Sequence, residues 1–130
     1  MIKIFCDGAS RGNPGPSSIG VSAMQEEREI FTLSEKLGIA TNNQAEWTSL
    51  LRALETAQRQ GFTEIQVFMD SELVVKQMLG LYKVKKPELK NIKDEVDKLA
   101  GALKKFQIAH IPRNKNGRAD ELANLAFEKP

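Results

Sequence analysis

Residues 2–16 read IKIFCDGASRGNPGP, and this stretch carries the first strong fold signal in the chain. It begins with IKIFC, a short apolar run that is typical of a buried strand. The run stops at Asp7, and the glycines and prolines that follow indicate a tight loop. In open α/β sheets, ligands bind beyond the carboxyl ends of the strands. We therefore expect a strand at residues 2–6 that presents Asp7 at a functional edge of a sheet.

Four more strands are expected further along the chain. Residues 19–24 and 29–33 have strand character and are joined by the polar turn QEER at 25–28. Residues 63–69 and 106–111 form two later apolar runs, each reached through helical segments. Hairpins make neighbouring strands antiparallel, whereas helical crossovers make them parallel. The sequence therefore predicts a five-stranded mixed sheet.

Helical signals separate the later strands. The sequence TNNQ at 41–44 fits a capping box, in which the side chains of Thr41 and Gln44 close the first turn. Pro87 stands where a proline is favoured, at the first position of a helix. The expected helices run from Thr41 to near Gly61, over residues 71–79, from Pro87 to about Leu103, and over residues 118–127 after a polar loop at 112–117. With helices on both faces of the mixed sheet, the fold class is α/β.

Composition limits the other possibilities. The 130 residues are 41% hydrophobic and 28% charged, which is typical of one soluble globular domain spanning residues 1–130. No apolar run approaches the ~20 residues of a membrane helix. The apolar start is too short for a signal peptide, and Cys6 is the only cysteine, so we expect a cytoplasmic protein without an internal disulfide. The net charge of +2 does not by itself indicate nucleic acid, although residues 83–105 hold eight lysines against four acids.

Asp7 and Asp70 form the first candidate site. Each directly follows an apolar run that is expected to be a strand. If these strands are adjacent and parallel, the two carboxylates lie about 5 Å apart. Like charges at that distance repel unless a cation lies between them. Either residue alone is also a common cap or turn residue at a strand end.

Glu46 and Asp120 extend the acidic set. Glu46 lies on or beside the apolar stripe of its helix, where a carboxylate is costly unless it is paired or bound to a metal. Asp120 falls in the first turn of the last helix, where the helix dipole alone would favour an acid. Four acids with few nitrogen or sulfur ligands suit Mg²⁺ or Mn²⁺. The pattern indicates metal-assisted phosphoryl chemistry and does not define the substrate.

Four motifs, taken together and in this order, resemble those of ribonuclease HI. They are DGASRGNPGP at 7–16, TNNQAE at 41–46, MDS at 69–71, and His110 followed by NGRADELA at 116–123. The resemblance runs from the first strand to the last helix. It implies a ribonuclease H-like fold and a metal-dependent endoribonuclease. Such an enzyme hydrolyses the RNA strand of an RNA–DNA hybrid by a two-metal-ion mechanism, with two Mg²⁺ ions that Mn²⁺ can replace.

The resemblance also implies roles for individual residues. Asp7, Glu46, Asp70 and Asp120 match the catalytic carboxylates that bind the metals. His110 matches a catalytic histidine that assists proton transfer or product release. The implied substrate contacts are Asn13 and Thr41 to a DNA phosphate, Asn42, Asn43 and Gln44 in the minor groove of the hybrid, and Gly8, Ser71 and Asn116 elsewhere in the site. The implied partner is the hybrid duplex, with no membrane association, and we expect a monomer.

The sequence departs from some members of that family in one place. They carry a basic helix, the basic handle, where this chain has only LYKVKK at 81–86 between Gly80 and Pro87. Tyr82 and the lysines of this segment could form a small stacking and phosphate-binding surface, or the segment could be a solvated loop. Trp47, the only tryptophan, falls on the core helix and is expected to serve packing.

Two other functions fit parts of the same pattern. The acids alone would also suit a nuclease of the same fold that acts on DNA, because a fold does not define a substrate. A module that binds hybrids without cleaving them would retain the fold as well. The matches at Asn13 and at residues 41–44 argue against the first alternative, and four intact carboxylates argue against the second.

Overall fold

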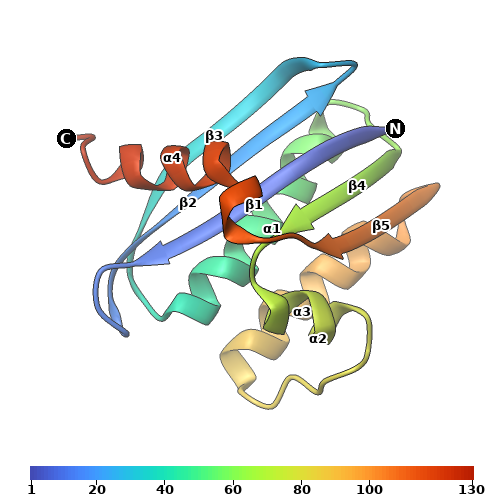
Figure 1. Ribbon diagram of the computed structural model, residues 1–130. Coiled ribbons are helices and arrows are strands. Elements are labelled where there is room, and N and C mark those ends of the chain that lie inside the picture. The colour runs from blue at the N-terminus through green and yellow to red at the C-terminus, as the bar shows by residue number, and fades with distance from the viewer.

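The computed structural model describes residues 1–130 and is built on a five-stranded sheet in the order β3-β2-β1-β4-β5 (Figure 1). The strands are β1 (Ile2–Ser10), β2 (Gly15–Gln25), β3 (Arg28–Ala40), β4 (Glu64–Met69) and β5 (Lys105–His110). β1, β2 and β3 pair antiparallel, whereas β4 is parallel to both β1 and β5. The predicted mixed sheet is confirmed.

Four α-helices cover the two faces of the sheet. They are α1 (Asn42–Arg59), α2 (Glu72–Met78), α3 (Pro87–Gly101) and α4 (Gly117–Ala126), and a short 3₁₀ turn, η1 (Arg113–Lys115), precedes α4. In Figure 1, α4 crosses one face over β1 and β2, while α1 lies behind the sheet with α3 beyond it. Thr41 and Gln44 form the predicted capping box, and Pro87 occupies the first turn of α3. The helices on both faces are therefore confirmed.

The hydrophobic core lies between the sheet and α1. Trp47, Leu50 and Leu54 of α1 are fully buried against Ile4 and Val67 of the central strands. The Nε1–H of Trp47 donates a hydrogen bond to Gln77 Oε1 at 3.0 Å, so the indole is both packed and satisfied. The expectation that Trp47 serves packing is confirmed. None of the helices has the length and apolar composition that crossing a bilayer requires.

β1 is longer than the apolar run that predicted it. It continues to Ser10, so the expectation that Asp7 ends its strand is wrong. The antiparallel pairing of β1 with β2 extends to Ser10 and Ser17, whereas the parallel pairing with β4 ends at Cys6 and Met69. Asp7 therefore lies just past the end of the parallel pairing, where β1 has lost one of its two neighbours.

β2 and β3 also extend beyond their apolar centres. They pair from Gly15 and Ala40 at one end to Gln25 and Arg28 at the other. The ends next to Gly15 and Ala40 contain several serines and glycines, and a register shift after Ser17 breaks the alternation that marks a strand. Backbone pairing across the hairpin, rather than apolar burial, fixes these ends.

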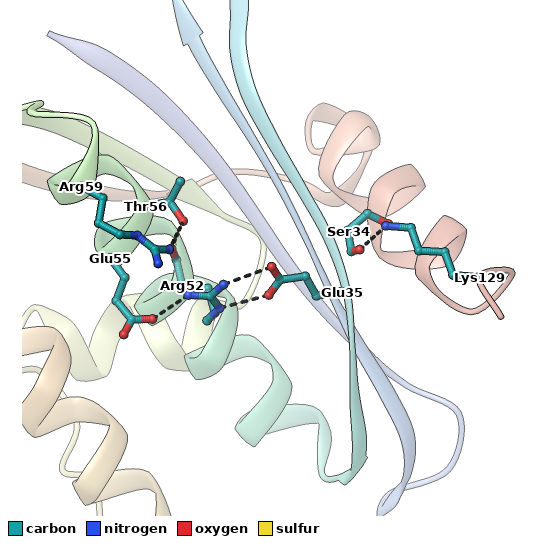
Figure 2. Close-up of polar contacts among 7 residues, drawn as sticks. All are labelled: Ser34, Glu35, Arg52, Glu55, Thr56, Arg59 and Lys129. Carbon is teal, nitrogen blue, oxygen red and sulfur yellow. Dashed lines mark hydrogen bonds and ion pairs between the residues drawn. The ribbon is translucent and has the colours of Figure 1, made fainter.

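Ion pairs hold the edge strand against α1. Arg52 of α1 reaches both carboxylate oxygens of Glu35 on β3, with Nε–Oε1 at 3.0 Å and Nη2–Oε2 at 3.1 Å, and its remaining nitrogen pairs with Glu55 (Figure 2). Figure 2 also shows Lys129, which donates from Nζ to the carbonyl of Ser34, so the C-terminal segment lies against β3. The bidentate contact between Arg52 and Glu35 helps to orient the helix that carries Glu46.

The segment between α2 and α3 contains no helix, so the basic handle is absent. Leu79, Leu81 and Tyr82 are exposed in it. Lys76 Nζ lies 5.2 Å from the centre of the Tyr82 ring, a distance typical of a cation–π contact.

α4 approaches the sheet closely because Gly20 has no side chain. A Cβ at Gly20 would lie 2.0 Å from the carbonyl oxygen of Ala119 and 2.4 Å from the backbone nitrogen of Ala123. Backbone atoms cannot rotate away as a side chain can. The backbone of α4 therefore rests directly on β2.

We predict that Gly20→Ala destabilises the protein by about 3 kcal/mol, because α4 must move off the sheet to make room. Gly101→Ala is the matched control, since no atom lies within 4 Å of a Cβ placed there. That variant should be neutral or up to about 1 kcal/mol more stable. Urea unfolding of both variants measures the effect. Equal stabilities of the two variants would contradict the close-packing explanation.

Candidate active site

Three carboxylates meet where the parallel pairing of β1 and β4 ends. Asp7 follows Cys6 on β1, Asp70 follows Met69 on β4, and Glu46 comes from the N-terminal part of α1. One carboxylate oxygen from each acid lies within 4.8 Å of the others. The approach of Asp7 to Asp70 agrees with the spacing expected for adjacent parallel strands.

A backbone contact between β1 and α1 fixes the carboxylate of Glu46. The N–H of Gly8 donates a hydrogen bond to Glu46 Oε1 at 2.5 Å. A Cβ at Gly8 would lie 2.3 Å from the carbonyl carbon of Ala45 and 2.4 Å from the backbone nitrogen of Glu46. Only glycine permits this approach, so Gly8 positions Glu46 through its backbone.

The acids strongly perturb one another. Burial, followed by the negative charges of Asp70 and Asp120, raises the pKa of Asp7 to about 8. Burial and the charge of Asp7 raise the pKa of Glu46 well above its usual value, although the Gly8 N–H opposes this shift. Without a cation the pocket therefore favours protonated acids. A bound cation would reverse that preference, because it stabilises the ionised carboxylates.

These acids line one cavity of about 430 Å³. Its lining also includes the predicted residues Gly8, Asn42, Asn43, Ser71 and Asp120, together with Ala9, Ser10 and Arg113. Ser71 caps α2, since its hydroxyl accepts the N–H of Val74 at 3.3 Å. The cavity therefore combines acids from two strands and two helices with polar groups from the starts of α1 and α2.

Asp120 enters the cavity from the first turn of α4. It lies outside the closest group of three acids but near enough to Asp7 to raise that residue's pKa. Asn116 holds the start of this helix: its side chain is buried, and Nδ2 donates to the carbonyl of Cys6 at 2.9 Å. Asn116 Oδ1 has no partner. Asn116 thus lies behind the cavity rather than in its lining.

The remaining predicted substrate contacts gather at the start of α1, outside the acidic cavity. Thr41 Oγ1 accepts the N–H of Gln44 at 3.1 Å, and Gln44 Oε1 accepts the N–H of Thr41 at 2.8 Å. Asn13 Oδ1 accepts the N–H of Asn42 at 3.1 Å, which ties the loop after β1 to this helix. These hydrogen bonds use one side-chain oxygen of each of the three residues. The side-chain amide nitrogens of Asn13 and Gln44 have no partner in the structure.

His110 also lies outside the cavity lining. It is the exposed last residue of β5, opposite Met69 of β4, and Asp70 follows Met69 in the chain. The structure thus places His110 one strand away from the acids.

Arg113 lines the cavity, although it was not among the predicted site residues. Its Nη2 lies 3.9 Å from Asp120 Oδ1. The sequence feature that could have indicated a role for Arg113 in the site is its position in the loop between His110 and Asp120. Arginines in polar loops are common, however, and nothing in the sequence separates this one from Arg118.

Comparison with known proteins extends the resemblance. Residues 5–126 match the family model described as reverse transcriptase-like. The chain is 39% identical over 128 residues to ribonuclease HI of Halobacterium salinarum, covering 98% of this chain and 64% of that protein. It is 32% identical over 145 residues to ribonuclease H of Photorhabdus laumondii, covering 100% of this chain and 90% of that protein.

Solved structures agree with these sequence matches. The crystal structure of RNase H1 from Halobacterium salinarum superposes with a TM-score of 0.94 at 38% identity, covering 98% of this chain and 97% of the other. LC11-RNase H1 from compost, in complex with an RNA/DNA hybrid, gives a TM-score of 0.93 at 43% identity, with coverages of 98% and 97%.

Several relatives are longer than this chain. It spans 64% of the Halobacterium protein and 35% of a bifunctional protein from Mycobacterium tuberculosis. The matching part nevertheless covers nearly all of this chain, including every acid of the cavity. The chain therefore belongs to the ribonuclease H family, and within it to the ribonuclease HI type.

Proposed function

We propose that this protein is a metal-dependent endoribonuclease that hydrolyses the RNA strand of RNA–DNA hybrids. One observation carries the proposal: oxygens of Asp7, Glu46 and Asp70 lie within 4.8 Å of one another in a chain of the ribonuclease HI type. A relative of 43% identity has been crystallised with an RNA/DNA hybrid, which supports the substrate assignment. Residues 1–130 act as one catalytic domain in this proposal.

The donor set fits a hard divalent cation. All the candidate ligands are carboxylate oxygens, as Mg²⁺ and Mn²⁺ prefer. The raised pKa values of Asp7 and Glu46 also mean that a bound cation would favour the ionised form of both acids. Asp7, Glu46, Asp70 and Asp120 would hold two Mg²⁺ ions, with Mn²⁺ as a substitute. Such ions supply an activated water and stabilise the leaving oxygen in phosphate-ester hydrolysis.

Polar groups around the acids would bind the hybrid. Asn42 and Asn43 in the cavity, and Gln44 beside it, offer amides to the minor groove, where RNA displays 2′-hydroxyls. Asn13 and Thr41 lie together at the start of α1, where backbone N–H groups favour a phosphate of the DNA strand. A deoxy strand bends into such a site more easily than an RNA strand. Together these contacts would select a hybrid over either pure duplex.

Gly8, Ser71 and Asn116 complete the proposed binding set in different ways. Gly8 and Ser71 line the cavity and can approach the RNA strand directly. Asn116 would act through position, because its amide holds the loop before α4 against β1. We further propose that the protein works as a monomer in the cytoplasm, where the Cys6 thiol would stay reduced.

We predict that the protein cleaves a labelled RNA–DNA hybrid in the presence of Mg²⁺, but not duplex RNA or duplex DNA. Asp70→Asn should nearly abolish cleavage while leaving the fold intact, because this half-exposed side chain contributes charge rather than packing. Gel analysis of the products and circular dichroism of the variant measure the two effects. Hybrid binding without cleavage by the wild type would support the non-catalytic module. Preferential cleavage of DNA would support the DNA nuclease.

A second prediction concerns pH and stability. Because the pKa of Asp7 rises from 3.8 to about 8 on folding, the metal-free folded state retains a proton that the unfolded chain releases. The free energy of unfolding in EDTA should therefore fall by on the order of a few kcal/mol from about pH 5 to about pH 8. Asp7→Asn should flatten this decline, and added Mg²⁺ should oppose it in the wild type. Denaturant unfolding across this range measures the decline, and a variant with the wild-type slope would contradict the cause given.

A third prediction separates His110 from the acids. If His110 assists proton transfer or product release, His110→Ala should lower kcat by roughly 10²-fold. Mn²⁺ affinity, measured by calorimetry, should stay at the wild-type value because the residue lies outside the acidic cavity. Unchanged kcat would remove the assigned role, and a loss of Mn²⁺ binding would make His110 a ligand instead.

A further inference from the structure

The acidic cavity has one positively charged lining residue, Arg113. It begins η1, the turn between β5 and α4, and its side chain is 84% exposed. The contact with Asp120, 3.9 Å from Nη2 to Oδ1, is at the long limit for an ion pair. Arg113 also opposes the upward shift in the pKa of Asp7, which burial causes first and Asp70 second. In the absence of metal, Arg113 is therefore the one positively charged lining residue that acts on the acids.

The guanidinium of Arg113 is free to take another partner. The one polar partner of its side chain in the structure is Asp120, in the long contact described above. Arg118, five positions along the chain, differs: both of its Glu29 contacts are short, at 2.9 and 3.1 Å, and it also pairs with Glu121. A long, exposed ion pair stabilises little and exchanges readily. Arg113 is thus an exposed cation with one long contact at the cavity, whereas Arg118 is held by two glutamates.

The charge of the cavity determines which anion the guanidinium of Arg113 contacts. While the acids are uncompensated, they attract the guanidinium toward Asp120. With divalent cations bound, the acids are neutralised and that attraction is lost. In the proposed reaction, the other anion at this cavity would be a phosphate of the strand to be cleaved. A guanidinium presents two parallel N–H donors that match phosphate oxygens.

We propose that Arg113 is a substrate-contacting residue that exchanges partners. Its guanidinium pairs with Asp120 in the metal-free protein and binds a phosphate of the RNA strand when the site is loaded. This inference rests on the proposed ribonuclease function and adds a residue to it. The metal-free half of the exchange can be tested without any nucleic acid.

Lys115 provides the matched control. It carries the same charge on the same loop and is exposed, but it lines a separate hollow of about 440 Å³ with Phe5 and Arg118 rather than the acidic cavity. Replacing either Arg113 or Lys115 by alanine removes one positive charge from the loop. Only Arg113→Ala removes a charge from the side that faces the acids.

The first experiment titrates Mn²⁺ into each protein by calorimetry at low salt, without hybrid. Arg113→Ala should bind Mn²⁺ about two- to fivefold more tightly than the wild type, because a competing cation is gone, and high salt should reduce the difference. Lys115→Ala should bind like the wild type. Equal Mn²⁺ affinities of Arg113→Ala and Lys115→Ala would overturn the counter-ion role.

The second experiment measures hybrid cleavage at saturating Mg²⁺. Arg113→Ala should lose about tenfold or more in kcat/KM, and Arg113→Lys should recover part of it, since charge returns without the fork. Lys115→Ala should stay near the wild-type value. An Arg113→Ala variant as active as the wild type would overturn the phosphate contact, as would an equal loss in Lys115→Ala. If the wild type fails to cleave hybrid at all, the proposed function fails, and the Mn²⁺ titration still decides the counter-ion role.

Discussion

The site depends on how closely two helix backbones approach the sheet. At Gly8 and Gly20 there is no Cβ between strand and helix, and one placed there would lie 2.3 Å and 2.0 Å from helix backbone atoms. Gly8 lets α1 bring Glu46 to β1 from one face, and Gly20 lets α4 bring Asp120 from the other. Asp7 pairs with Gly20 across the strands and precedes Gly8, so it lies between both approaches. A side chain at either position would separate the acids.

Bringing the acids together opposes folding. The pKa of Asp7 rises to about 8 through burial first and neighbouring charges second, so the metal-free site holds protonated or repelling carboxylates. Proteins commonly accept such local instability where function requires it. The rest of the fold compensates through a fully buried core around Trp47 and through the bidentate Arg52–Glu35 contact that anchors α1 to β3. Rigid support outside the site thus keeps the repelling groups in place.

The loop between β5 and α4 has two different sides. On one side, Arg113 faces the acids, and its one ion pair is the long contact with Asp120. On the other, Arg118 is fixed by Glu29 and Glu121, and Asn116 fastens the loop to the carbonyl of Cys6. Because Asp120 follows in the first turn of α4, the same anchors position a carboxylate and leave a cation free. One short segment therefore combines fixed and exchangeable electrostatic contacts.

The sequence by itself predicted the element order, the mixed sheet and the four acids that the structure places around one cavity. These predictions rested on apolar runs, on the capping box at Thr41, and on the helix-starting proline at position 87. Each of these signals depends only on residues close together in the sequence, so a single sequence is enough to recognise it. It misplaced the end of β1 and the lengths of β2 and β3, because backbone pairing with a neighbouring strand fixes those ends. Only the tertiary structure showed that Asn116 is buried behind the cavity and that Arg113 lines it. Those two facts depend on contacts between residues far apart in sequence, such as the hydrogen bond from Asn116 to the carbonyl of Cys6. The spacing of apolar residues along the chain does not reveal such contacts.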